Sequence, residues 1–250
     1  MRPYRVVRIL CHSLRSASQL CRPDEKQVCA IFNRNPYYTL VELMNQFLPA
    51  INAIRVQAGF LTLEETLRLG EQGNVMLDPF SVLISRGISL GGGNTFYPQT
   101  TLETRQSATI HCGSGNTFYS GTLLLATTGQ ICIGNDNLFG PGGLSMKLTD
   151  GNGDLQIGSR GRYQNGAQLL GGNTLGDGCQ VLGAIAVLNC QLESGGDYHH
   201  AEPDERGAVL KGMGTARHLR LRQGQVINGL GDFSAAPIES QSKYHPKVGR

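Results

Sequence analysis

The stretch IGSRGRYQNGAQLLGGNTLGDGCQVLGAIAV, residues 157–187, places an apolar or aromatic side chain at every sixth position. These side chains are Ile157, Tyr163, Leu169, Leu175, Val181 and Val187. A period of six fits neither the 3.6-residue period of an α-helix nor the two-residue alternation of a simple strand. It is typical of a parallel β-helix, in which each hexad supplies one short strand and a turn, and three hexads close a coil.

The same step recurs before this stretch. It runs through Ile84, Leu90, Phe96, Leu102 and Ala108, then through Cys112, Phe118 and Leu124, and then from Ile133 and Phe139 to Ile157 with interruptions at Ser145 and Gly151. The turn-rich residues 149–154 form a bulge that preserves the hexad phase. We therefore expect an all-β core over residues 75–195.

Glycine is the compositional outlier, with 34 of 250 residues, whereas tryptophan is absent. Gly-Asn-Thr occurs at residues 93–95, 115–117 and 172–174, between the apolar positions. Tight turns need residues that tolerate unusual φ and ψ, which are Gly, Asn and Asp. The glycine surplus is thus explained by repeated turns.

Composition excludes several classes of protein. Charged residues make up 16% of the chain and the net charge is +3, which favours neither a disordered protein nor a nucleic-acid partner. The sequence contains no run of 18 apolar residues, so it predicts no membrane-spanning helix. Seven cysteines without a C-x-x-C pair indicate reduced thiols, and we expect a cytoplasmic location.

Residues 1–34 form a basic N-terminal extension. Residues 1–22 carry five arginines and no acid, a pattern that fits either a solvated extension or an organellar transit peptide. At the other end, residues 196–233 read as a loop and a basic closing segment, and residues 234–250 as an extended or disordered tail.

Residues 35–74 have helical periodicity and predict an N-terminal α-helical cap. Apolar side chains recur at three- and four-residue steps at Leu40, Leu43, Met44, Phe47, Leu48, Ile51 and Ile54. A first helix should begin near Pro36 or Thr39, and the capping box from Thr62 to Glu65 should begin a second. Such a pair either covers the open end of a β-helix or has a separate binding role.

Because of these repeats, the chain resembles the hexapeptide-repeat transferase family. Residues 73–80, GNVMLDPF, and 93–98, GNTFYP, add a local resemblance to the acetyltransferase domain of the bifunctional N-acetylglucosamine-1-phosphate uridyltransferase/glucosamine-1-phosphate acetyltransferase. That family's nucleotidyltransferase domain and its Lys-x-x-His-Leu-x-Tyr stretch have no counterpart here. The resemblance implies a left-handed β-helix, a homotrimer, and acyl transfer from acetyl-CoA or a related acyl-CoA to a sugar or sugar nucleotide.

The candidate site lies where the repeats stop. Such transfer needs a base near neutral pKa, and His199 and His200 are flanked by carboxylates that can orient them. We predict these two histidines as catalytic, with Asp197, Tyr198, Arg217 and Arg220 as binding residues. The alternative is a solvated acidic loop and a solvated basic face.

Two other functions remain open. The chain could be a non-catalytic scaffold or sugar-nucleotide-binding subunit, because no complete catalytic motif is present. A γ-carbonic-anhydrase-like zinc protein needs three suitably placed histidines, and none of the six here has the His-x4-His spacing of that group. We therefore expect no metal.

Overall fold

The computed structural model describes residues 36–149, 151 and 153–245. The chain divides into two compact units, residues 1–54 and 55–250. The expectations for residues 1–34 lie outside the described residues. Helix α3 (Pro36–Gln57) confirms the first predicted helix. Met44, Phe47 and Ile54, which the helical periodicity places on one apolar face, are exposed.

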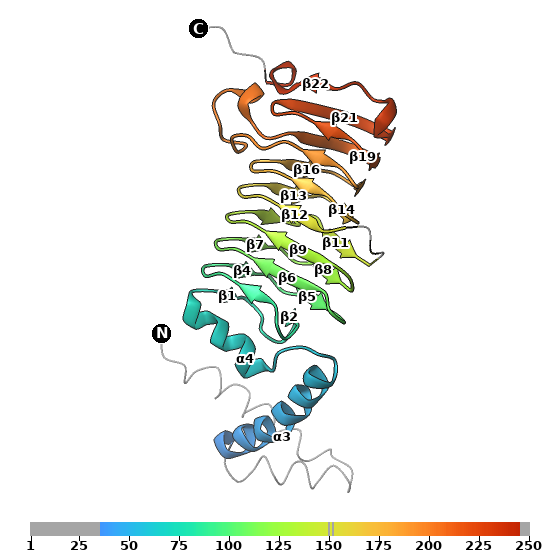
Figure 1. The fold of residues 1–250 in the computed structure, drawn as a ribbon. Coiled ribbons are helices and arrows are strands. Elements are labelled where there is room, and N and C mark those ends of the chain that lie inside the picture. The colour runs from blue at the N-terminus through green and yellow to red at the C-terminus, as the bar shows by residue number, and fades with distance from the viewer. Residues whose placement is uncertain (1–35, 150, 152, 246–250) are drawn as a thin grey trace, which may run out of the picture. The chain divides into compact units, whose positions relative to one another are not determined.

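Short parallel strands stacked in three ladders form the second unit, as expected for a parallel β-helix (Figure 1). The first ladder contains β1 (Val75–Met76), β4 (Thr95–Phe96), β7 (Thr117–Phe118), β10 (Leu138–Phe139), β13 (Arg162–Gln164) and β16 (Gln180–Leu182). The second contains β2 (Leu83–Ile84), β5 (Thr101–Thr104), β8 (Thr122–Ala126), β11 (Leu144–Leu148), β14 (Ala167–Leu170) and β17 (Ile185–Leu188). The third contains β3 (Ser89–Leu90), β6 (Thr109–Cys112), β9 (Gln130–Ile133), β12 (Leu155–Ile157), β15 (Thr174–Leu175), β18 (Gln191–Leu192) and β20 (Arg220–Leu221).

The core runs along the inside of these coils. The six-residue step from Ile157 to Val187 selects buried side chains throughout. Ser145 is not one of them, because Leu144 and Met146 on either side of it point inward instead. The coils also differ in length. Phe96, Phe118, Phe139 and Tyr163 pair in turn at one position of the first ladder, but the number of residues between them is not constant.

Buried asparagines stack along one inner corner of the first coils. The side-chain oxygen of Asn94 accepts hydrogen bonds from the backbone and side-chain nitrogens of Asn116, at 2.9 and 3.1 Å. Asn74 accepts in the same way from Asn94, and Asn116 from Asn137. The turn interpretation is wrong for these asparagines: the left-handed φ belongs to glycines such as Gly93, while the asparagines satisfy buried backbone groups.

The asparagine ladder ends at Gly161, beside the last ring of an aromatic stack. Phe96, Phe118, Phe139 and Tyr163 stack in order, with ring centroids 4.9 to 5.4 Å apart. Gly161 takes the next ladder position, where its backbone nitrogen donates to Asn137 Oδ1. A Cβ on Gly161 would lie 2.6 Å from the Tyr163 hydroxyl oxygen, so the missing side chain makes room for that hydroxyl.

Replacing Tyr163 with phenylalanine is expected to leave the fold intact and to raise the free energy of unfolding by about 1 kcal/mol. The Tyr163 hydroxyl is fully buried and has no hydrogen-bond partner among the described residues, and burying such a group costs about 1–3 kcal/mol. Burial also raises the pKa of this phenol well above its ordinary value. Urea unfolding followed by circular dichroism measures the change.

The matched control for this variant is Phe139→Tyr, which adds a hydroxyl to the preceding ring of the stack. Asn137 holds the ladder position beside that ring, where Gly161 makes room for the hydroxyl of Tyr163. We expect that control to lose stability. A loss of more than about 1 kcal/mol in Tyr163→Phe would show that the hydroxyl has a partner in solution.

The β-helix continues past residue 195, beyond the expected boundary. Strand β19 (Val209–Arg217) pairs in parallel with β16 and then with β17, and β21 (Gln225–Asp232) pairs in parallel with β19. Gly212 and Gly214 within β19 have φ of 118° and 135°, so one continuous strand joins two ladders without the six-residue step. The sequence repeat is therefore lost there although the coils persist.

The tail expectation is wrong for residues 234–245. Strand β22 (Glu239–Ser240) pairs antiparallel with β21, between the short 3-10 helices η3 (Phe233–Ala235) and η4 (Gln241–Lys243). The Gln241 side chain is buried and donates to the carbonyl of Gly207 at 2.8 Å. This segment therefore covers the last coil.

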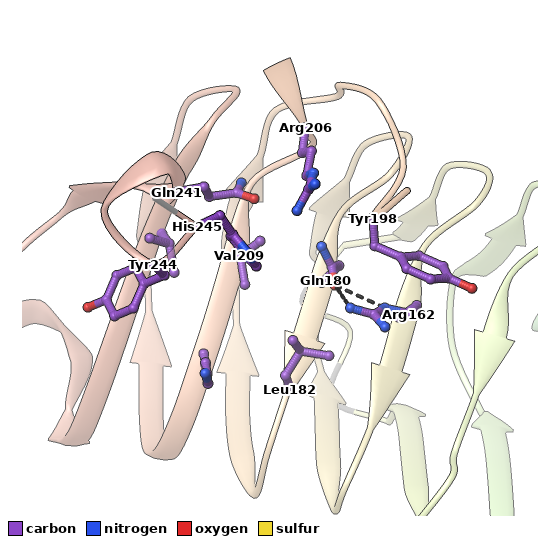
Figure 2. A pocket seen from close by; sticks show the side chains of 11 residues that line it. Arg162, Gln180, Leu182, Tyr198, Arg206, Val209, Gln241, Tyr244 and His245 are labelled. Atoms are coloured by element: carbon purple, nitrogen blue, oxygen red, sulfur yellow. Dashed lines mark hydrogen bonds between the residues drawn. The ribbon is translucent and has the colours of Figure 1, made fainter. Parts of the chain in front are cut away.

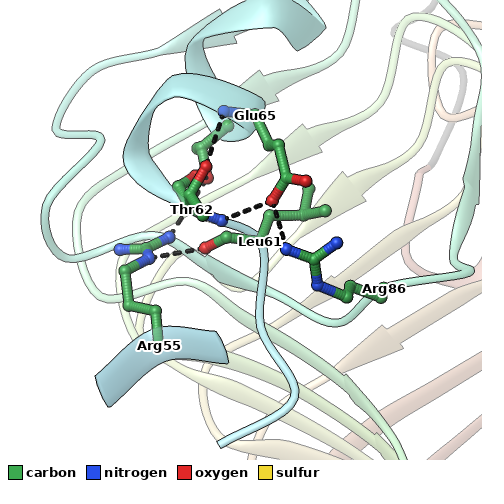
Figure 3. A network of polar contacts seen from close by, with 6 residues as sticks. Arg55, Leu61, Thr62, Glu65 and Arg86 are labelled. Carbon is green, nitrogen blue, oxygen red and sulfur yellow. Dashed lines mark hydrogen bonds and ion pairs between the residues drawn. The ribbon is translucent and has the colours of Figure 1, made fainter. Parts of the chain in front are cut away.

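Helix α4 (Leu63–Arg68) and the 3-10 helix η1 (Leu69–Gln72) precede the first coil (Figure 1). The predicted capping box is confirmed, because the Thr62 side chain accepts from Glu65 N and the Glu65 carboxylate accepts from Thr62 N (Figure 3). Buried Arg55 donates to the carbonyls of Leu61 and Val82. Leu61 and Leu69 pack against the core, as a cap requires.

Three cysteines are buried inside or beside the coils as free thiols, Cys112, Cys179 and Cys190. Burial raises the pKa of Cys112 and Cys179 to about 12, so these thiols are unreactive near neutral pH. None of the helices in the described part of the chain is long and apolar enough to cross a membrane.

Candidate functional site

Residues 193–208, here called the histidine loop, leave the coil after β18 and return at β19. The Asp197 side chain accepts from the backbone nitrogen of His199 at 2.8 Å, which closes a turn. The Arg206 guanidinium donates twice to the carbonyl of His200, from Nε at 2.9 Å and from Nη2 at 2.7 Å. These bonds and the 3-10 helix η2 (Pro203–Glu205) hold the loop in one conformation.

The imidazole of His200 has a distinct electrostatic setting. Its Nδ1 lies 3.2 Å from the carbonyl oxygen of Glu202, and since a carbonyl only accepts, Nδ1 is the protonated donor. That leaves Nε2 as the basic nitrogen of the neutral ring. Nε2 lies 3.5 Å from a carboxylate oxygen of Glu205.

Gly196 determines where this ring can lie. A Cβ at Gly196 would approach the imidazole of His200 to 2.6 Å, so only glycine allows the ring to rest against the backbone. The side chain of His200 stays 40% exposed, and a small molecule can therefore reach it.

Two aromatic side chains continue from the loop towards the coils. The ring of His199 lies 3.9 Å from that of Tyr198, centroid to centroid, and the Arg162 guanidinium lies 3.8 Å from the centroid of the Tyr198 ring. His199 is exposed, and its ring makes no hydrogen bond with any residue that the structure describes. The two histidines therefore differ, because only His200 has an oriented ring.

A pocket of about 240 Å³, here called the cationic pocket, lies beside the loop on the outside of the first ladder (Figure 2). It is lined by Arg162, Gln180, Leu182, Tyr198, Arg206, Val209, Lys211, Val226, Gln241, Tyr244 and His245. Strands β13, β16, β19 and β21, the histidine loop and the segment after β22 supply these residues. No carboxylate is among them.

The sequence-predicted residues are only partly brought together. Asp197, Tyr198, His199 and His200 share the histidine loop, and Tyr198 alone of the six lines the cationic pocket. Arg217 ends β19 opposite Leu188 of the second ladder, and Arg220 lies opposite Gln191 of the third. Both arginines are exposed, and the pocket does not include them. Their binding role stays a prediction.

Four polar residues of the pocket were not predicted from the sequence: Arg162, Gln180, Arg206 and Lys211. A signal existed for Arg162 and Gln180, since each directly precedes a buried residue of the six-residue step and must therefore point outward. Nothing comparable marked Arg206, whose position depends on the path of the loop.

Among the described residues, no group of three or more His, Cys, Asp or Glu side chains could hold a metal ion. A comparison with protein-family models finds no match to the sequence, and neither does a comparison with curated proteins.

Proposed function

We propose that this chain is an acyltransferase that moves an acetyl-type group from a CoA thioester to a hydroxyl or amine of a sugar or sugar nucleotide. The observation that carries the proposal is the setting of His200, with Nδ1 on a backbone carbonyl and Nε2 near Glu205. A tautomer fixed through Nδ1, which leaves Nε2 able to take a proton, is what a general base needs. The resemblance of the repeats to hexapeptide-repeat transferases supplies the reaction class.

In the proposed reaction Nε2 of His200 takes the proton from the acceptor as its oxygen or nitrogen attacks the thioester carbonyl carbon. The carbon–sulfur bond then breaks, and its electron pair leaves with the sulfur. The imidazolium returns the proton to the departing CoA thiolate, so no other reactant is needed. Glu205 stabilises the imidazolium between these two steps.

The finer features of the fold belong to the same proposal. We take the β-helix to be left-handed and built from hexapeptide repeats, and the working form to be a homotrimer, as the resemblance implies. Light scattering coupled to size exclusion gives the molar mass in solution, and a trimer is the expected result.

The second candidate is a non-catalytic subunit that binds a sugar nucleotide. The absence of any carboxylate among the pocket-lining residues favours it, because such a site can hold an anion without reacting with it. Binding of a sugar nucleotide without turnover of any acyl-CoA would select this function.

The experiment that tests the proposal is a transfer assay that measures free CoA. The purified chain is offered acetyl-CoA or succinyl-CoA with a panel of amino sugars and sugar nucleotides. We expect acceptor-dependent release of CoA by the native chain, and none by the double variant His199→Ala/His200→Ala with an unchanged circular dichroism spectrum. Equal release by both proteins would remove the histidines from the mechanism.

A further inference from the structure

The two arginines of the cationic pocket are held in place by neutral groups. Arg162 donates from Nε and Nη2 to the side-chain oxygen of Gln180, and its face covers the Tyr198 ring (Figure 2). Arg206 donates from Nε and Nη2 to the carbonyl of His200. Each guanidinium is therefore fixed in direction while its charge is left uncompensated.

No described carboxylate forms an ion pair with these charges. Within the described ranges, none lies within ion-pair distance of Arg162, Arg206 or Lys211; the ion pairs formed there by arginine and lysine involve Arg86, Arg105, Arg160 and Lys243. Nη1 of both pocket arginines also makes no hydrogen bond with a described residue. Five N–H donors per guanidinium are available, so each arginine keeps donors for a ligand.

The arrangement is costly without an anion. Burial lowers the pKa of Arg162, Tyr198 acts against this by raising it, and the charge of Arg206 lowers it. The two guanidinium groups therefore repel each other. Arginines that line one pocket with free donors match the oxygens of a phosphate group, which accepts several charge-assisted hydrogen bonds at once. Lys211, which lines the same pocket, adds a third positive charge.

We propose that Arg162 and Arg206, with Lys211, form a phosphate-binding subsite within a single chain, which holds the phosphate or diphosphate of a ligand beside His200. The role of that ligand in the reaction rests on the proposed function. The binding of the anion does not, because it can be measured without turnover. The phosphate belongs either to the acyl donor, as in CoA, or to a phosphorylated acceptor, as in a sugar nucleotide.

The test is calorimetric titration of the purified chain with four probes at low ionic strength: inorganic pyrophosphate, CoA, UDP-N-acetylglucosamine and unphosphorylated N-acetylglucosamine. We expect binding of pyrophosphate and of one of the two nucleotide probes, weakened by added salt because the contacts are ionic. Tighter binding of CoA assigns the subsite to the donor, and tighter binding of the UDP-sugar assigns it to the acceptor.

The variants compare Arg162→Gln with Arg68→Gln, which removes an exposed arginine of α4 far along the chain. Arg162→Gln should weaken pyrophosphate binding at least about tenfold, and Arg68→Gln should leave it unchanged. Arg162→Lys, which keeps the charge, should recover part of the affinity if the variant chain melts like the native one. Absence of pyrophosphate binding, or an equal loss in Arg68→Gln, would overturn the subsite.

The transfer assay separates this inference from the proposed function. Pyrophosphate binding that depends on Arg162, found together with no acyl transfer, would leave the subsite standing and remove the acyltransferase. If the chain transfers acyl groups and Arg162→Gln leaves the KM for both substrates unchanged, the acyltransferase stands and the subsite is removed.

Discussion

Replacing Asn116 with alanine is expected to lower the free energy of unfolding by about 3–5 kcal/mol. The Asn116 side chain donates to Asn94 Oδ1 and to the Gly134 carbonyl, and it accepts from the backbone and side-chain nitrogens of Asn137. Alanine removes four hydrogen bonds, at a net cost of about 1 kcal/mol each. The Asn137 backbone nitrogen and the Gly134 carbonyl lose their partner, whereas Asn94 Oδ1 still accepts from the backbone nitrogen of residue 116 and Asn137 Nδ2 still donates to the Gly158 carbonyl. Because domains have only about 5–15 kcal/mol in total, thermal unfolding followed by circular dichroism should detect the change easily.

Two further variants isolate the hydrogen bonds of the ladder. Asn135→Ala, in the same coil, removes an exposed acceptor of the Ser114 backbone nitrogen, which water can replace. Its cost should stay below about 1 kcal/mol. Asn116→Asp keeps the size of the side chain but points an acceptor at two acceptors, so it should destabilise at least as much as alanine. A stable Asn116→Asp chain would contradict the hydrogen-bond explanation.

Replacing His200 with alanine should reduce kcat for acyl transfer by a factor of about 10² to 10⁴, the usual contribution of general base catalysis. The acceptor's proton then has no acceptor atom in reach, while substrate contacts elsewhere are kept, so KM should change little. The loop should survive, because Arg206 binds the backbone carbonyl of His200 and not its ring. Steady-state kinetics with the acceptor found in the transfer assay measure both constants.

The matched control is His199→Ala, in the neighbouring residue. The ring of His199 lies tilted against Tyr198 and has no hydrogen-bonded partner in the described structure, so this variant should stay within a few-fold of the native kcat. A loss in His199→Ala that matches or exceeds the loss in His200→Ala would reject the assignment of the base. Thermal melting of both variants excludes unfolding as the cause.

The sequence predicted stacked parallel coils because apolar side chains recur in it at every sixth position over several separate stretches. Phe96, Phe118, Phe139 and Tyr163 each occupy an apolar position of one of these stretches, and each is buried, because burial of a large apolar side chain is favourable. The same reasoning failed after residue 195. There β19 runs through two ladders as one strand, and its glycines at positions 212 and 214 replace the turns that kept the earlier step.

The candidate site was predictable only in part, for a related reason. The histidine loop was visible as a break in the repeat, and its two histidines as residues suited to acid–base chemistry. Which of the two is oriented depends on the carbonyl of Glu202 and the space left by Gly196, and neither leaves a pattern in the sequence. The same is true of the cationic pocket, where Arg162 and Arg206 come from a strand and a distant loop.

By itself, then, the sequence determined what repeats along this chain: the burial period, the positions of tight turns and the capping box of α4. These are local properties, because each depends on side chains within a few residues of one another. The tertiary structure alone decided which outward-facing groups meet. Stacking of coils brings residues from distant parts of the chain into one pocket, and the charges left unpaired there depend on distances that no local pattern encodes.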